Sequence, residues 1–251
     1  MSKLTDIYLP VLKQSQRLGL VAPCIVKTQS EWWSGATLNV GQLSEIWMSR
    51  KLLKPGTQRQ VLEDYRECGG ETTAPGLFAH ELGHIFRHAW IHNRRVAPLR
   101  GYREVFDRTS RFDDTEHAWN HMIEYREQHP DTELDDDRYL NWNAWANTEE
   151  DFCDCFAELV LAEGDCSSYR NRPGIYRKLK FIRQAGRKIL VANPLLGSSN
   201  RRGMLYLSAG EKKSKCPVEG HIYGVPKRPD TYLCPCGTPV VHDGGRITHD
   251  D

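Results

Sequence analysis

The segment from Ala74 to about Asn93 carries the strongest helical pattern in the chain. Its apolar residues recur at the three- and four-residue spacing of one helical face, and Ala74-Pro75 is a typical helix start. The apolar stripe consists of Phe78, Leu82, Ile85, Phe86 and Ala89. His80 and His84 are four residues apart, so both project from one side of this helix, away from the apolar stripe. Any fold of this chain must therefore bury one face of the helix and present two imidazoles from another.

The run His80-Glu81-Leu82-Gly83-His84 indicates a zinc site. Two imidazoles at this spacing on a helix can hold one zinc ion, and Glu81 then lies beside the metal, placed to take a proton from its bound water. The alternative interpretation is a polar helix face that carries histidines without a metal. A catalytic zinc takes three protein ligands and leaves one position for water, so the motif requires a third ligand.

The third ligand is not one of the next histidines along the helix. At 1.5 Å of rise per residue, His88 lies about 12 Å along the axis from His80, too far to share its ion. We therefore expect His88 and His92 to be exposed residues of the polar face. A metzincin would place its third histidine six residues after the second, and Trp90 occupies that position, which excludes this class.

Two further helices are predicted downstream, one from about Thr148 to Glu163 closed by Gly164 and a basic one from about Tyr176 to Leu190. The start of the first, residues 147–157, resembles the second metal-binding helix of gluzincin metallopeptidases, especially lethal-factor-like enzymes. It contains an acidic residue, an aromatic, a small residue, a second acidic residue and another aromatic. The resemblance implies that Glu150 is the third zinc ligand and that Asp154, one turn later, orients a ligating histidine. Two alternatives remain: Glu149 is the ligand instead, or both glutamates only favour the helix dipole. Cys153 and Cys155 stand where the family carries small residues, so we interpret them as core side chains.

The resemblance also implies a reaction. Zinc polarises a scissile carbonyl and lowers the pKa of water, while Glu81 takes the proton and later delivers it to the leaving amine. The expected protein is a zinc metallopeptidase, a hydrolase with Glu81 as the catalytic residue. The family often adds a tyrosine or histidine that stabilises the tetrahedral intermediate. No motif places such a residue here. Tyr139 is one candidate, but we favour a core or surface role for it.

A second group of metal-ligand residues lies near the C-terminus. Cys216 and His221 form one cluster, and Cys234 and Cys236 form another. Together they resemble a zinc ribbon with a structural Cys₃His zinc site. A module of about 40 residues without an apolar core needs a metal to fold. The alternative is a tail whose thiols bind no metal, and the other cysteines, Cys24, Cys68 and Cys166, have no partner by spacing.

Charge is unevenly divided along the chain, although the total is only +1. Residues 167–216 contain thirteen Lys or Arg and one acidic residue, a net +12, whereas residues 1–166 carry −9 and residues 217–251 carry −2. A basic stretch beside a zinc ribbon is typical of a nucleic-acid surface. One interpretation is therefore that residues 170–215 contact a nucleic acid. The alternative is a basic helix that docks on the acidic part of the same chain.

The layout of a metallopeptidase helix, a basic stretch and a C-terminal ribbon is similar to that of SprT-like proteases, which act on proteins attached to DNA. Those proteins take a third histidine from a short downstream motif, and no His-Gly pair here matches it. The similarity therefore concerns architecture alone, and Glu150 remains the expected ligand. The rival function is a nucleic-acid- or protein-binding protein in which zinc is only structural.

The sequence thus predicts an α+β fold, a zincin-like metallopeptidase domain with a small C-terminal zinc-ribbon module. We expect the metallopeptidase domain in residues 1–195, a basic linker in 196–212 and the zinc-ribbon-like module in 213–251, with one catalytic and one structural Zn²⁺ and a protein or peptide as substrate. The first six residues lack an apolar signal core, and no apolar run approaches the roughly 18 residues of a membrane span. We therefore expect a cytoplasmic protein without a membrane segment.

Overall fold

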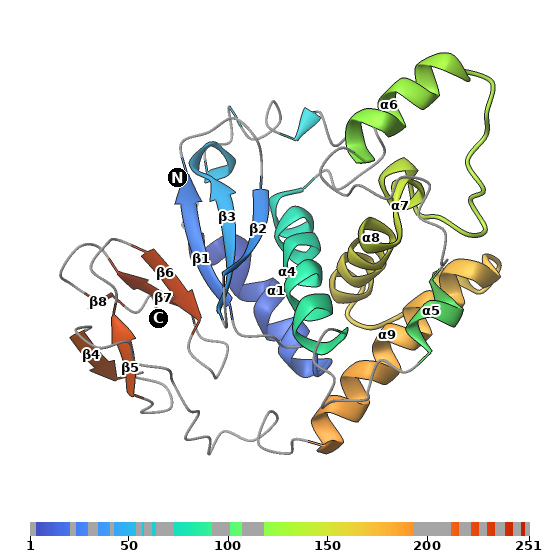
Figure 1. Cartoon of the computed structure of the whole chain (residues 1–251). Coiled ribbons are helices and arrows are strands. Elements are labelled where there is room, and N and C mark those ends of the chain that lie inside the picture. Colours follow the sequence, from blue (N-terminus) through green and yellow to red (C-terminus); the bar gives the residue numbers. More distant parts are fainter. Residues whose placement is uncertain are drawn as a thin grey trace.

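The fold was analysed in a computed structural model of the 251-residue chain (Figure 1). The structure describes residues 4–20, 24–29, 35–40, 43–53, 57, 62–63, 73–91, 101–106 and 118–192 and, nearer the C-terminus, 212–215, 222–225, 230–233, 239–242 and 247–248. Its helices are α1 (Leu4–Arg17), η1 (Arg50–Leu53), α4 (Ala74–Ile91), α5 (Tyr102–Val105), α6 (Ala118–Gln128), α7 (Trp142–Ala146), α8 (Thr148–Leu161), η2 (Ser167–Tyr169) and α9 (Pro173–Ala192). Its strands are β1 (Cys24–Gln29), β2 (Gly35–Val40), β3 (Leu43–Ser49), β4 (Lys212–Lys215), β5 (Ile222–Val225), β6 (Asp230–Leu233), β7 (Pro239–His242) and β8 (Ile247–Thr248).

Strands from both ends of the chain form one sheet in the order β2-β3-β1-β6-β7-β8. β2 and β3 pair as an antiparallel hairpin, and β3 pairs with β1 in parallel. Strand β6 then adds to the other edge of β1, where Ile25 lies opposite Tyr232 and Val26 opposite Thr231. Strands β4 and β5 form a separate two-stranded sheet. The C-terminal segment therefore contributes strands to the N-terminal sheet, while the predicted domain boundaries stay a prediction.

Strand β3 was not expected from the sequence. Its residues Leu43-Ser44-Glu45-Ile46-Trp47-Met48-Ser49 alternate only in their second half, where Ile46 and Met48 are fully buried. These two side chains belong to the main core of the protein. The strand thus supplies the middle of the three N-terminal strands and one wall of the core.

Helix α4 lies between the N-terminal strands and α8, as Figure 1 shows, and it contacts β2, β3, α1 and α8. Its apolar residues between Ala74 and Phe86 pack into the core, together with the aromatic side chains of α8 and α5. The face that carries the histidines points toward α8 rather than toward open solvent, because α8 packs against it. No helix among the described residues is long and apolar enough to cross a bilayer.

The close approach of α4 and α8 depends on Gly83. A Cβ atom at this position would lie 3.1 Å from Cα of Cys153 and 3.3 Å from the side chain of Phe156. Such distances are shorter than ordinary van der Waals contact, so glycine lets the two helices pack closely at this point. Since α4 carries the histidines and α8 carries Glu150, this contact sets how near the predicted ligands come to one another.

Helix α8 begins and ends with clear capping contacts. The side chain of Asn147 accepts hydrogen bonds from the backbone N–H groups of Glu149 and Glu150, at 2.8 and 2.9 Å. At the other end, Gly164 has a φ of 80° and its N–H donates to the carbonyl of Leu159 at 2.8 Å. The sequence predicted this helix from about Thr148 with Gly164 as its stop. The cap fixes the backbone of the first turn, where Glu150 lies.

Candidate metal centre

Three side chains predicted as zinc ligands meet at one point between α4 and α8. The Nε2 atoms of His80 and His84 are 3.1 Å apart. Glu150 places one carboxylate oxygen 3.1 Å from Nε2 of His80 and the other 3.6 Å from Nε2 of His84. The structure thus brings together residues that are about 70 positions apart in the sequence, each with a ligand atom directed at the other two.

These separations suit a zinc ion. Zinc binds histidine nitrogen and carboxylate oxygen at about 2.0–2.2 Å in tetrahedral geometry, which places neighbouring ligand atoms about 3.3–3.6 Å apart. The observed separations of 3.1 to 3.6 Å are close to this range. Two imidazoles and one carboxylate are also a ligand set that zinc prefers. The residues present therefore fit a zinc ion held by His80, His84 and Glu150.

Asp154 contacts the second ring nitrogen of His80, and its role in orienting a metal ligand stays a prediction. Its carboxylate lies 2.7 Å from Nδ1 of His80, and both side chains are almost fully buried. The amide of Asn143 donates to Glu150 at 2.9 Å and also lies 3.3 Å from the second oxygen of Asp154. The amide of Asn143 therefore links Glu150, the expected third ligand, to Asp154, the carboxylate that contacts His80. Asn143 comes from α7, and nothing in the sequence pattern pointed to it.

Glu149 has the equivalent position behind His84. Its carboxylate lies 3.0 Å from Nδ1 of His84, and its other oxygen lies 2.8 Å from Nη1 of Arg87. The sequence offered Glu149 only as an alternative ligand or as a dipole partner. Arg87 follows His84 by three residues and so lies on the same helix face, but this spacing does not indicate that either residue contacts Glu149 of another helix.

The charges of the site act strongly on its histidines. Burial lowers the pKa of His80, but the carboxylates of Asp154 and Glu150 outweigh it and raise the pKa well above the ordinary 6.5. Burial also lowers the pKa of His84, and nearby carboxylates, Glu150 foremost, raise it above 6.5. The charge of Glu81 contributes to this rise, so the Glu81 carboxylate lies within electrostatic range of His84.

Glu150, the expected third ligand, is held in its charged form. Burial raises the pKa of Glu150, but His84, His80 and the hydrogen bond from Asn143 lower it to about 2. The carboxylate is therefore ionised at neutral pH and ready to bind a cation.

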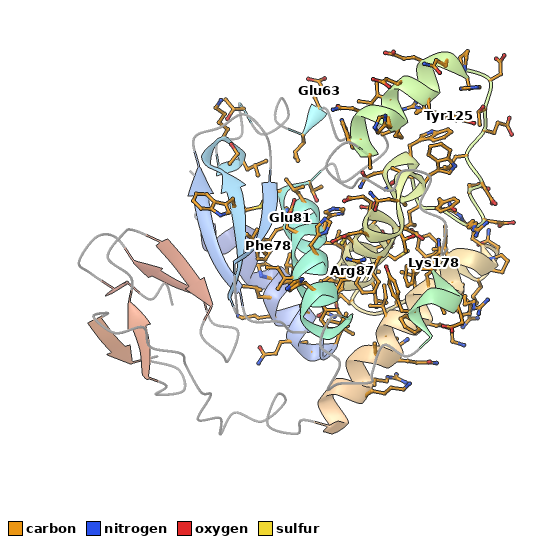
Figure 2. The ribbon with its side chains drawn as sticks, viewed as in Figure 1. Glu63, Phe78, Glu81, Arg87, Tyr125 and Lys178 are labelled. Carbon is orange, nitrogen blue, oxygen red and sulfur yellow. The ribbon has the colours of Figure 1, made fainter. Side chains whose placement is uncertain are left out.

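The general base predicted from the sequence lies in the same region. Glu81 is buried on α4, at the position labelled in Figure 2. The side chains of His84 and Glu150 keep 16% and 20% of their surface exposed, whereas that of His80 keeps 5%. Solvent therefore reaches the centre from the side of His84 and Glu150.

Cys153 lies beside the centre as well as in the core. Ligand atoms of His80, His84 and Cys153 all lie within 4.8 Å of one another. The two Glu150 oxygens lie 3.1 Å from Nε2 of His80 and 3.6 Å from Nε2 of His84. Burial raises the pKa of the Cys153 thiol, and the negative charges of Glu150 and Glu149 raise it further, so the thiol is neutral. Because a thiolate is the ligand form of cysteine, Cys153 would have to lose its proton to bind a metal. Cys155 is also buried, as expected.

Tyr139 lies in the packing between α7 and α9. The ammonium of Lys178 is 4.6 Å from the centre of its ring, and its backbone carbonyl accepts from Arg172 at 3.0 Å. These contacts explain its position without a catalytic role, and a role for Tyr139 in the reaction stays a prediction.

The basic segment divides into buried and exposed parts. Lys178 is buried and pairs with Asp151 of α8, with Nζ 2.6 Å from the carboxylate, and Figure 2 marks its place on α9. Arg172 donates to the backbone carbonyls of Asp136 and Tyr139. These two residues dock on the acidic part of the chain. Other basic residues of α9 remain exposed, namely Arg177, Lys180, Arg187 and Lys188.

The four predicted ribbon ligands, Cys216, His221, Cys234 and Cys236, lie outside the described residues. The strands that flank them are described and pair in antiparallel register. Lys215 of β4 lies opposite Ile222 of β5, and Leu233 of β6 lies opposite Pro239 of β7. Each cluster therefore falls in the connection between two paired strands. His92, Cys68 and the side chain of Cys24 also lie outside the described residues. Cys166 is buried. His88 was expected to be exposed, but it is half-buried.

Comparisons with protein families, curated proteins and solved structures found no match to this chain. The functional argument therefore proceeds from the geometry of the site.

Proposed function

We propose that the protein is a zinc-dependent metallopeptidase with a zincin-like α+β fold, in which His80, His84 and Glu150 hold the metal. The observation that carries the proposal is the convergence of their ligand atoms within 3.1 to 3.6 Å. The carboxylates Asp154 and Glu149 behind the two histidines support it, because a zinc-binding histidine usually donates its other ring N–H to such a group.

The chain's own residues have distinct roles in peptide hydrolysis. When bound, zinc lowers the pKa of water and polarises the scissile carbonyl. Glu81 accepts the proton of the attacking water and delivers it to the leaving amine nitrogen. Asp154 and Glu149 hold the imidazoles so that each Nε2 atom faces the centre. Asn143 keeps the Glu150 carboxylate oriented through its hydrogen bond.

The experiment compares metal content and peptidase activity in matched variants. We expect about two zinc ions per wild-type chain if the C-terminal cluster also binds zinc, and loss of one ion in His80→Ala and Glu150→Ala. Glu81→Gln should keep its zinc and lose cleavage of a broad peptide library. Wild-type protein that binds zinc but is no more active than Glu81→Gln would contradict the enzyme proposal and favour a purely structural metal.

Cobalt substitution identifies the third ligand. A cobalt ion bound through a thiolate has a strong near-ultraviolet charge-transfer band, whereas binding through nitrogen and oxygen gives none. We expect no such band from this centre when Cys216, Cys234 and Cys236 are replaced by serine. A band that disappears on a further Cys153→Ala change would assign the ligand role to Cys153 instead of Glu150.

A second candidate function is nucleic-acid binding through residues 170–215. It is favoured by α9, which contains no acidic residue and exposes Arg177, Lys180, Arg187 and Lys188. We expect DNA affinity that falls steeply with salt, and a weaker salt dependence when these four residues become glutamine. Absent binding, or binding independent of salt, would refute this function.

A further inference from the structure

Two adjacent glutamates begin α8, and the structure uses them differently. Glu150 faces Nε2 of both histidines, at 3.1 and 3.6 Å. Glu149 instead faces Nδ1 of His84, at 3.0 Å. Both residues are carboxylates in the same partly buried first turn, so their chemistry alone does not decide which one binds a metal. The difference must come from the residues around them.

Arg87 provides that difference for Glu149. Its Nη1 atom lies 2.8 Å from the second carboxylate oxygen of Glu149. A guanidinium is permanently charged and presents its donors in a fixed plane, so it holds a carboxylate in a defined orientation. Both oxygens of Glu149 are thereby engaged, one by His84 and the other by Arg87.

Arg87 is itself held by a residue from a third helix. Its Nε atom donates to the hydroxyl of Tyr102 at 3.1 Å, and its guanidinium lies 5.7 Å from the centre of the Tyr102 ring. The hydroxyl in turn donates to the backbone carbonyl of Thr148 at 3.2 Å. Thr148 directly precedes Glu149 in α8. The contacts therefore link Glu149 to Arg87 of α4, Arg87 to Tyr102 of α5, and Tyr102 to the residue next to Glu149.

These contacts also decide which ring nitrogen of His84 carries the hydrogen. An ionised carboxylate only accepts hydrogen bonds, so Nδ1 of His84 must donate to Glu149. The lone pair of His84 then lies on Nε2, which faces His80 and Glu150. In this arrangement Nε2 is the atom available to a metal.

We propose that Arg87 and Tyr102 are positioning residues that act through Glu149, and that they have two effects. They hold His84 with Nε2 directed at the metal, and they keep Glu149 from replacing Glu150 as the third ligand. This inference rests on the proposed metal centre, but it concerns residues outside the predicted ligand set.

The first test measures zinc affinity by chelator competition at constant pH. We expect Glu149→Gln and Arg87→Met to bind zinc about 10- to 100-fold more weakly than wild type, the loss usual for such supporting contacts. Tyr102→Phe should lose less, and Arg87→Lys should recover part of the loss of Arg87→Met because it keeps the charge. Glu127→Gln and Arg17→Met change exposed residues of the same types and should bind zinc as wild type does.

A spectroscopic measurement separates positioning from general damage. In zinc-loaded protein, imidazole ¹H–¹⁵N correlation spectra should show His84 with its hydrogen on Nδ1. That hydrogen should exchange with water faster in Arg87→Met than in wild type. Unchanged zinc affinity in both Glu149→Gln and Arg87→Met, or an unchanged His84 signal, would overturn the proposal. If Arg87→Met does not fold, zinc affinity and the His84 signal are measured in Arg87→Lys and Tyr102→Phe instead, and the same outcomes support or overturn the proposal.

A double variant tests the choice between the two glutamates. Glu150→Gln should lose most of its zinc affinity, and Glu150→Gln with Arg87→Met should bind zinc more tightly than Glu150→Gln alone, because Glu149 is released. A double variant no tighter than the single one would overturn this second effect. Wild-type protein that binds no zinc at this centre would instead refute the proposed function, so the two failures are distinguishable.

Discussion

Gly83 is the residue on which the distance between the two ligand-bearing helices depends. Replacement by alanine would place a Cβ atom 3.1 Å from Cα of Cys153, a backbone atom that moves only with α8. We expect Gly83→Ala to lower the free energy of unfolding by about 1–3 kcal/mol, the usual cost of overpacking a core. We also expect weaker zinc binding, since α8 must shift away from His80 and His84. Urea unfolding and chelator competition measure the two effects.

The matched control is Gly174→Ala combined with the same two measurements. A Cβ there would meet the backbone carbonyl of Asp137 at 2.7 Å, far from the histidines in the sequence. It should therefore cost stability without weakening zinc binding. Equal zinc affinity in wild type and Gly83→Ala would show that the helix spacing does not control the centre.

The histidines also predict how stability depends on pH. A histidine titrates near 6.5 in the unfolded chain, and the folded protein raises the pKa of His80 and His84 above that value. Their protonated forms thus stabilise the zinc-free protein fully below pH 6.5, and this contribution is lost as the pH rises through the folded pKa values. Zinc requires neutral imidazoles, so zinc affinity should rise over the same pH range.

Urea unfolding of zinc-free protein between pH 6 and 9 measures the loss of stability, and chelator competition over the same range measures the rise in zinc affinity. His129→Gln is the control, because this side chain is exposed and lies outside the centre. Its pH profile should match that of wild type, whereas His80→Ala should flatten it. A zinc-free stability that rises with pH across this range would contradict the electrostatics described for the centre.

The sequence predicted the residues of the centre better than the contacts that support them. The spacing of His80 and His84 follows from helix geometry alone, and family resemblance indicated Glu150 and Asp154. Asn143 and Tyr102 come from short helices whose directions depend on tertiary packing, and no periodic pattern reports such directions. The role of Glu149 depends on Arg87, a contact between helices that sequence spacing within one helix does not reveal.

Among the elements, α8 and α9 are joined by a buried ion pair. Lys178 and Asp151 are 2.6 Å apart, and their side chains are only 3% and 2% exposed. Lys178→Met should lower the free energy of unfolding by about 3–5 kcal/mol, because it leaves a buried carboxylate without its partner. Lys178→Met with Asp151→Leu should recover most of that loss, since burying two apolar side chains is often neutral.

Urea unfolding of zinc-loaded protein measures these values, with Lys180→Met as the control for an exposed lysine of the same helix. If Lys178→Met lowers the free energy of unfolding no more than this control does, the ion pair contributes nothing to stability. Zinc content should be measured in parallel, because Asp151 directly follows Glu150.

Elements with a continuous pattern were the easiest to predict from the sequence. Helix α4 was expected from Ala74 to about Asn93 and extends from Ala74 to Ile91. Helix α9 was expected only from about Tyr176 to Leu190, whereas it includes Pro173 and reaches Ala192. Strand β3 was missed because polar Ser44 and Glu45 interrupt its apolar residues. The pairing of β1 with β6 was also missed, since partners so far apart in sequence share no local signal.

At the scale of the whole molecule, the C-terminal strands cover an edge of the N-terminal sheet. A chain that ends at Val225 would lack β6 to β8 and uncover the edge of β1 at which Ile25 and Val26 pair with β6. Uncovered strand edges promote association, so we expect this truncated protein to elute as larger species in size-exclusion chromatography with light scattering. A chain that ends at His242 loses only β8 and should elute as the full chain does.

A second control separates strand pairing from metal binding. Cys234→Ser with Cys236→Ser keeps the strands but removes two predicted ligands of the C-terminal site. If this variant associates as strongly as the truncated chain, the metal rather than the pairing of β6 with β1 protects the sheet edge.

The pairing of Ile25 with Tyr232 also sets an order of events during synthesis. About 200 residues separate the two strands, and at roughly 5–20 residues per second their synthesis takes on the order of 10–40 s. The residues of the metal centre, from His80 to Asp154, leave the ribosome well before β6 does. All residues of the proposed centre are therefore present while β1 still lacks its last neighbour. The newly made chain then carries an open strand edge together with every proposed metal ligand of that centre.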